Sequence, residues 1–133
     1  MRSLPLLITV MLMAACTSPP IARSVPTFSG DYIDARKDST ARINPVHQAP
    51  LHVPAYLIQH DIDASAVVAF MVETDGRTSE VQIVSTTDDQ FAEAVCESLL
   101  RWRYAPPIRD GALVRVVLEE SIGYRYNQYP RTP

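Results

Sequence analysis

Three histidines are the first residues in this sequence that could do chemistry, because imidazole nitrogens bind metal ions. His47, His52 and His60 lie five and eight residues apart. Structural zinc sites instead have ligands two to four residues apart, with a second ligand pair further along the chain. The spacing therefore predicts no metal site.

Serine and aspartate residues give no stronger signal for catalysis. Ser65, Ser79 and Ser85 lack the glycine-flanked turn of a hydrolase nucleophile, and the four glycines of the chain form no phosphate-binding loop. Asp88 and Asp89 resemble a carboxylate pair, but adjacent acidic residues at a predicted helix start favour capping and the helix dipole. The sequence thus indicates a protein that is not an enzyme and has no cofactor.

The start of the chain has the features of an export signal. Arg2 supplies a positive charge and precedes a short apolar run, residues 4–15, with Pro5 near its start. A helix that crosses a bilayer needs about 20 apolar residues. We therefore expect a signal peptide, residues 1–15, that is removed, and no permanent membrane span.

The end of this run resembles the lipobox of bacterial lipoproteins, in which small residues precede a cysteine that is acylated and becomes the new N-terminus. Ala14, Ala15 and Cys16 fit that pattern, whereas Met13 stands where leucine, valine or isoleucine is usual. The resemblance implies a lipid on Cys16. Thr17 stands where an aspartate would mark retention at the inner membrane, so the outer membrane is favoured. The alternative is an ordinary secretory signal with a coincidental cysteine.

Length and charge predict one domain and no polyanionic partner. The chain has 133 residues, 47% of them hydrophobic and 20% charged, with a formal net charge of −3. Positive and negative residues alternate without forming a basic block, which argues against nucleic-acid binding. With lipid on Cys16, Cys96 has no disulfide partner. Cys96 falls inside an apolar helical pattern, so we expect a buried, unreactive thiol.

A tether is expected between the signal and the domain. Residues 16–50 contain five prolines among serine, threonine, aspartate and arginine, and no sustained apolar period. Such a composition predicts a mostly unstructured segment. The compact domain is expected at residues 51–126, followed by a C-terminal tail at residues 127–133.

The expected domain opens with a β-hairpin. Residues 65–74 form an apolar run rich in valine, and Asp75 and Gly76 follow it. An Asp-Gly pair between two apolar runs is a strong hairpin signal. Alternating residues at 81–85 predict the second strand.

A helix and a third strand are expected next. Thr87 and Gln90 have the spacing of a capping box, apolar residues then recur at intervals of three and four, and two prolines predict an end near Tyr104. Residues 113–126 return to a period of two, and Glu120 interrupts their apolar face at a bulge or at the rim of the sheet. The sequence therefore predicts an α+β fold in which one helix packs on a three-stranded antiparallel sheet, in the order β-β-α-β.

This order of elements resembles the carboxy-terminal domain family of TonB, a periplasmic module that contacts outer-membrane transporters. The residues that carry the resemblance are Phe70, Gly76, Phe91, Trp102, Tyr104 and Pro106. The last three form the family's clearest short pattern. They imply that Trp102 packs on the core from the last helical turn and that Pro106 directs the chain toward the third strand.

The chain also departs from the family pattern. Members usually have a Tyr-Pro pair ahead of the first strand, where this chain has Val53 and Pro54, so the shape of residues 51–64 is left open. An energy-transducing TonB has an inner-membrane helix and a long proline-rich spacer, and neither is found here. We therefore expect a binding role without force transmission.

In the family, the third strand lies at the sheet edge and pairs with an extended segment of the partner. The corresponding residues here are Val114, Arg115, Val116, Val117, Leu118 and Glu119. We expect a membrane-anchored periplasmic lipoprotein that binds an envelope protein or extended peptide by strand addition, as an accessory in protein interaction or transport. The alternative is a structural envelope lipoprotein that packs into a complex or self-associates, for example as a homodimer, through the same edge.

Overall fold

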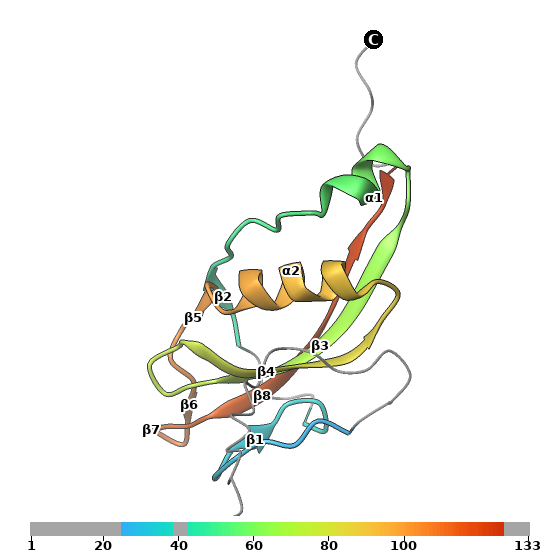
Figure 1. Cartoon of the computed structure of the whole chain (residues 1–133). Coiled ribbons are helices and arrows are strands. Elements are labelled where there is room, and N and C mark those ends of the chain that lie inside the picture. Colours follow the sequence, from blue (N-terminus) through green and yellow to red (C-terminus); the bar gives the residue numbers. More distant parts are fainter. Residues whose placement is uncertain (1–24, 39–42, 127–133) are drawn as a thin grey trace, which may run out of the picture.

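A four-stranded sheet is the main element of the fold. The computed structural model describes residues 25–38 and 43–126, and the sheet has the spatial order β1-β8-β3-β4 (Figure 1). Its strands are β1 Ile33–Asp34, β3 Ala64–Val72, β4 Thr78–Thr86 and β8 Val116–Tyr124. The central strand β3 is antiparallel to both long neighbours, whereas β1 runs parallel to β8.

The described residues also form two helices and four short strands outside this sheet. They are β2 Pro45–His47, α1 Ala55–Gln59, α2 Asp89–Leu99, β5 Arg103–Tyr104, β6 Ile108–Arg109 and β7 Ala112–Leu113. Strand β2 pairs with β5, and β6 pairs with β7. The predicted α+β class is confirmed, with three long strands and one long helix in the predicted order. Helix α1 and the short strands were not predicted.

The β3–β4 hairpin forms where the sequence predicts it. Gly76 adopts a φ of 84°, which glycine tolerates far better than other residues. The Gly76 amide donates to the Glu73 carbonyl oxygen at 2.9 Å, and the Arg77 amide donates to the Asp75 carboxylate at 2.9 Å. These bonds close the turn between the two strands.

The start of α2 differs from the predicted capping box. The N-cap is Asp88, whose carboxylate accepts a hydrogen bond from the Phe91 amide at 2.8 Å, and Asp89 lies in the first turn. The expected cap, Thr87, instead accepts a hydrogen bond from the Ser65 amide at 2.9 Å. Thr87 therefore holds the end of β4 to the start of β3. The capping role expected for the two aspartates is confirmed.

The end of α2 also differs from the prediction. The helix ends at Leu99, five residues before the expected end at Tyr104. The chain turns there because its backbone finds partners outside the helix. The Tyr104 amide donates to the Gly76 carbonyl oxygen at 2.9 Å, and the Ala105 amide donates to that of Asn44 at 3.2 Å. Trp102 thus follows the helix instead of lying in its last turn.

The hydrophobic core lies between α2 and one face of the sheet. It contains alternate residues of β3 and the apolar side of α2: Ala64, Ala66, Val68, Phe70, Val72, Phe91, Ala92, Val95, Cys96 and Leu99. Alternation along a strand places one set of side chains on each face, so this pattern follows from the sequence. Cys96 is 2% exposed, which confirms the expected burial.

The segment 25–38, here called the N-terminal segment, lies on the opposite face of the sheet (Figure 1). The Thr27 amide donates to the Gln82 side chain at 3.2 Å, and the Gln82 amide group donates back to the Thr27 carbonyl oxygen at 2.7 Å. Ala69, beside Gln82 in the register, and Met71 are fully buried on this face. The expectation of an unstructured tether is therefore wrong for residues 25–38, and β2 and its pairing show the same for residues 45–47.

Candidate functional site

The two sides of β8 have different backbone partners. Its pairing with β3 is continuous from Ala64 opposite Tyr124 to Val72 opposite Val116. On the other side, the carbonyl oxygens of Arg115 and Val117 accept hydrogen bonds from the N-terminal segment at 2.9 and 3.0 Å. Backbone groups of successive strand residues point to opposite sides. Odd-numbered residues of β8 therefore direct their N–H and C=O groups outward.

Strand β1 covers only the first part of this outer side. It lies opposite Val116 and Val117, and in the described part of the chain no strand pairs with the outer side of residues 119–124. Glu119, Ser121 and Gly123 thus present outward backbone groups without a strand partner. This stretch, residues 119–124, is here called the open edge.

The open edge overlaps little with the edge expected from the sequence. Of the six expected residues, only Glu119 belongs to it. Val114 precedes β8, and its amide donates to the Pro107 carbonyl oxygen at 2.9 Å. The N-terminal segment occupies the outer side of Arg115 and Val117. A strand of two residues such as β1 is too short to produce a periodic sequence signal. The pairing of β1 with the outer side of β8 was therefore not predicted from the sequence.

Arg115 is a structural residue and not a free contact for a partner. Its guanidinium donates to the two carboxylate oxygens of Glu73 at 2.7 and 3.1 Å, to Glu80 at 3.2 Å and to the Ser29 carbonyl oxygen at 2.8 Å. The hydrogen bonds from Arg115, the hydrogen bond from the Ser79 hydroxyl and the charge of Arg115 hold the pKa of Glu73 below its usual value. Arg115 therefore joins β8, the hairpin and the N-terminal segment.

The opposite edge of the sheet, on β4, is less suited to strand addition. Glu80 has a φ of 47°, and the pairing of β3 with β4 shifts register at two places. The Ser29 amide and hydroxyl also donate to the Glu80 carboxylate, at 3.1 and 2.9 Å. Bulges and attached side chains interrupt the regular row of backbone groups that an added strand needs. The open edge of β8 is therefore the better candidate.

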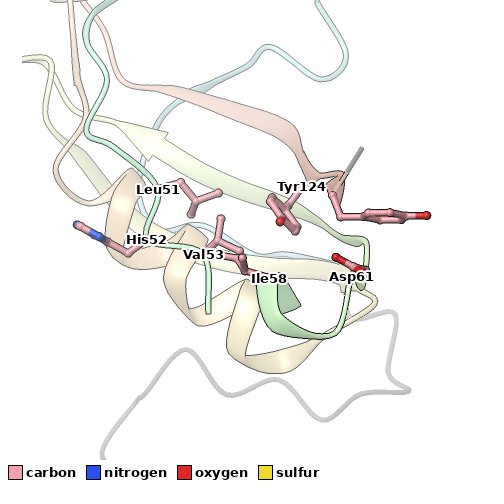
Figure 2. Close-up of a pocket in the computed structure, with 7 residues that line it drawn as sticks. Leu51, His52, Val53, Ile58, Asp61 and Tyr124 are labelled. Carbon is pink, nitrogen blue, oxygen red and sulfur yellow. The ribbon is translucent and has the colours of Figure 1, made fainter. Parts of the chain in front are cut away.

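A cleft of about 480 Å³ lies at the end of the open edge (Figure 2). Leu51, Val53 and Ile58 line one side, and Tyr124 and Tyr126 at the end of β8 line the other, with His52 and Asp61 at its margin. Ile58 is 52% exposed. The cleft is mainly apolar and could receive side chains of a segment bound along β8.

Helix α1 forms one wall of this cleft and is fixed to α2. The Tyr56 hydroxyl donates to the Asp88 carboxylate, and this bond to an anion raises the pKa of Tyr56 to about 12. Asp88 therefore caps α2 and anchors α1 at once. The shape of this segment could not be predicted from the sequence, because a helix of five residues is too short for a reliable apolar period.

The residues that suggested catalysis are not brought together. His47, His52 and His60 are all exposed. Residues 25–38 and 43–126 contain no group of three histidine, cysteine or acidic side chains placed to hold a metal ion. Within the same residues, no helix is long and apolar enough to span a membrane. The arrangement offers a strand edge and a cleft, which are features of a binding site.

The residues of the family pattern occupy structural positions. Phe70 and Phe91 are fully buried, and Tyr104 is 3% exposed. Trp102 is partly buried, packs against the core and donates from Nε1 to the Ser98 hydroxyl at 3.2 Å. Pro106 is exposed, just beyond β5. Together with Gly76 in the hairpin turn, these residues hold the hairpin, α2 and β5 to one another.

The fold and the open edge define a small α+β binding domain of the TonB C-terminal type. Residues 50–126 match the family described as "Gram-negative bacterial TonB protein C-terminal", and the chain belongs to this family. No curated protein sequence matches the chain.

Two solved structures share the fold. The TonB C-terminal domain of Pseudomonas aeruginosa, solved by solution NMR, is similar over 69% of this chain and 91% of that chain, with a TM-score of 0.52 and 19% identity. The TonB2 protein of Vibrio anguillarum is similar over 77% of this chain and 92% of that chain, with a TM-score of 0.50 and 21% identity. At these identities the likeness concerns the fold.

Proposed function

We propose that this protein is a lipid-anchored envelope lipoprotein whose domain binds an extended segment of another envelope protein along the open edge. The observation that carries the proposal is the row of outward backbone groups at Glu119, Ser121 and Gly123, beside an apolar cleft. Backbone pairing at a sheet edge supplies affinity, and pockets for alternate side chains supply specificity. Membership of the TonB C-terminal family supports the same mode of binding.

The anchor in this proposal is a lipid on Cys16, which lies outside the described residues. The lipobox-like residues 12–16 support it, and Thr17 favours the outer membrane with the domain facing the periplasm. The protein then acts as an accessory in protein interaction or transport and does not transduce energy. It performs no enzymatic reaction in this proposal.

Proline substitution tests the edge. Ser121→Pro removes an outward N–H group and blocks an added strand, whereas proline at a sheet edge is tolerated by the fold. We expect Ser121→Pro to keep the native circular dichroism spectrum and to lose the partners that the wild-type protein captures from envelope extract. Ser121→Ala keeps the N–H group and serves as the matched control. Ile122→Pro, which removes an inward N–H group, should destabilise the fold.

A self-associating structural lipoprotein is the second candidate, because the same open edge can pair with its copy. Sedimentation velocity of wild-type and Ser121→Pro proteins separates the two candidates. Capture of the same heterologous protein by a monomeric wild type supports the binding accessory. Self-association that Ser121→Pro abolishes, without a heterologous partner, supports the structural protein. If Ser121→Pro folds and binds every partner as the wild type does, recognition does not use the open edge.

A further inference from the structure

Glu120 is a carboxylate on the apolar face of the sheet. It lies opposite Val68 in the register of β3 and β8, and Val68 is fully buried. Its neighbours on the same face of β8, Leu118 and Ile122, pack against the core. The pairing of β3 with β8 has no register shift here. Glu120 therefore does not mark a bulge, which was one of the two interpretations of the sequence. Its side chain is half-buried, and this burial raises the pKa of the carboxyl.

A second polar group, the Tyr104 hydroxyl, lies within range of the charge of Glu120. Tyr104 is 3% exposed, and its ring centroid is 5.9 Å from that of Phe70. Its hydroxyl is buried and has no hydrogen-bond partner among residues 25–38 and 43–126. Burial raises the pKa of Tyr104, and the nearby charge of Glu120 contributes to this rise. Among the described residues, no side chain forms an ion pair with Glu120.

Buried polar groups are normally hydrogen-bonded, and removing a carboxylate from water costs free energy unless a partner compensates for it. Within the described residues, neither Glu120 on β8 nor the Tyr104 hydroxyl on β5 has such a partner. The missing partner must donate hydrogen bonds, and a cation satisfies the carboxylate best. A position that lowers stability in the free protein and is completed by a partner is typical of a recognition site.

We propose that Glu120, with the Tyr104 hydroxyl beside it, recognises a lysine or arginine side chain in the segment that binds the open edge. This inference rests on the proposed function. A residue of an added strand directly opposite Glu120 would share its face of the sheet, with Cβ atoms about 4.5 to 5.5 Å apart. Its ammonium or guanidinium group would reach the carboxylate and donate a hydrogen bond there.

The cleft indicates a second feature of the bound segment, an apolar residue near the basic one. In the bound segment, the side chains two residues before and two residues after the basic residue lie on the same face as it does. One of these two side chains lies opposite Ile122, toward the cleft lined by Leu51 and Val53. The partner is therefore an extended segment with a basic residue and an apolar residue two positions away.

Two synthetic peptides test this pattern with the full-length protein in detergent. One is the acetylated, amidated heptapeptide Thr-Val-Thr-Lys-Thr-Val-Thr, and the other has norleucine in place of lysine. The sequence is symmetric, so a valine lies two residues from lysine in either strand direction. We expect the lysine peptide to bind about tenfold more tightly in isothermal titration calorimetry, a difference of about 1.4 kcal/mol that one charge-assisted hydrogen bond supplies.

Three variants test the roles of Glu120 and of the Tyr104 hydroxyl. Glu120→Gln should abolish the preference for lysine, whereas Glu119→Gln, on the exposed opposite face, should retain it. Tyr104→Phe should retain the fold and reduce the preference. Equal binding of both peptides to the wild type would overturn the role of Glu120, and the edge would still stand if Ser121→Pro abolished that binding. If neither peptide binds, strand addition in this form fails and this inference fails with it.

Discussion

Gly76 lies so close to Tyr104 that a Cβ atom on the glycine would be 2.0 Å from the Tyr104 carbonyl oxygen. The Tyr104 amide in turn donates to the Gly76 carbonyl oxygen at 2.9 Å. Tyr104 belongs to β5, so these contacts press the turn of the β3–β4 hairpin against the chain that leaves α2. The close approach explains why the hairpin turn and the residues after the helix belong to one structural unit.

Gly76→Ala should therefore be strongly destabilising. The alanine would combine a positive φ with a clash against backbone, and we expect a loss of roughly 2 to 5 kcal/mol in the free energy of unfolding. Gly111→Ala is the matched control, because Gly111 has a φ of 77° and no atom within 4 Å of its added Cβ. The control should cost only about 1 kcal/mol. Urea denaturation measures both, and equal losses would show that the contact with Tyr104 is unimportant.

Arg115 should control the acid stability of the domain. It lowers the pKa of Glu73 in the folded state, so this carboxylate stabilises the fold above its unfolded value of 4.5 and loses that contribution as the pH falls through the folded pKa. Arg115→Gln removes the largest cause of the lowered pKa and leaves the hydrogen bond from the Ser79 hydroxyl to Glu73. The variant should be less stable than wild type at pH 7, and the difference should shrink below about pH 4.5.

The control for this prediction is Arg77→Gln. Arg77 forms an ion pair with Asp75 at 3.5 Å, and its side chain is 69% exposed. Exposed pairs contribute little, so its pH profile should follow the wild type. Thermal melts from pH 3 to 8 provide the measurement. A constant difference between Arg115→Gln and wild type over this range would contradict the role of the Glu73 carboxylate.

Glu120 should have the opposite pH dependence. Burial raises its folded pKa, so its ionised form destabilises the fold once the pH exceeds its unfolded value, and protonation relieves this as the pH falls. Glu120→Gln should therefore raise the melting temperature at pH 7, and the gain should diminish toward pH 4. Glu119→Gln should show no such gain. A Glu120→Gln protein that melts below wild type at pH 7 would mean that the carboxylate is stabilised in the free protein.

Trp102→Ala should destabilise the domain by roughly 2 to 4 kcal/mol, somewhat less than the loss of a fully buried tryptophan. Trp102 is partly buried, stacks near Tyr104 with ring centroids 6.3 Å apart and donates to Ser98. Trp102→Phe keeps an aromatic ring and should lose less. Guanidinium denaturation measures the free energy of unfolding of both variants. An unchanged midpoint for Trp102→Ala would show that the ring contributes little to the core.

The long elements of this fold could be predicted because their apolar periods are local. The apolar run at residues 65–74 and the apolar residues from Phe91 to Trp102 each contain enough residues to distinguish a strand from a helix. The end of α2 could not be predicted, because Tyr104 lies in β5, where its amide donates a hydrogen bond to the carbonyl oxygen of Gly76, a residue distant in the sequence. Local propensity contains no information on such a partner.

The candidate site was predicted less well than the fold. The proposed site lies on the strand that the sequence analysis named, but only Glu119 is shared. Strand β1 has two residues, and nothing in the spacing of Ile33 and Val116 indicates that they pair. Arg115 was expected in the partner-binding edge, whereas its guanidinium binds three acceptors that lie 35 to 86 residues away along the chain. Short strands and side-chain networks depend on tertiary contacts, and these decided which part of β8 stays open.

Attachment through Cys16 gives the last prediction, because acylation requires a thiol and residues 12–17 contain no other. Wild-type protein should fractionate with membranes, whereas Cys16→Ser should be soluble or remain an uncleaved precursor. Cys96→Ala is the matched control: it removes the buried thiol, lowers stability and leaves attachment intact. Intact mass spectrometry should show acyl chains on a protein that begins at residue 16. A wild-type protein that is fully soluble, with an unmodified N-terminus at another residue, would exclude the lipid anchor and leave the binding edge to be judged by its own experiments.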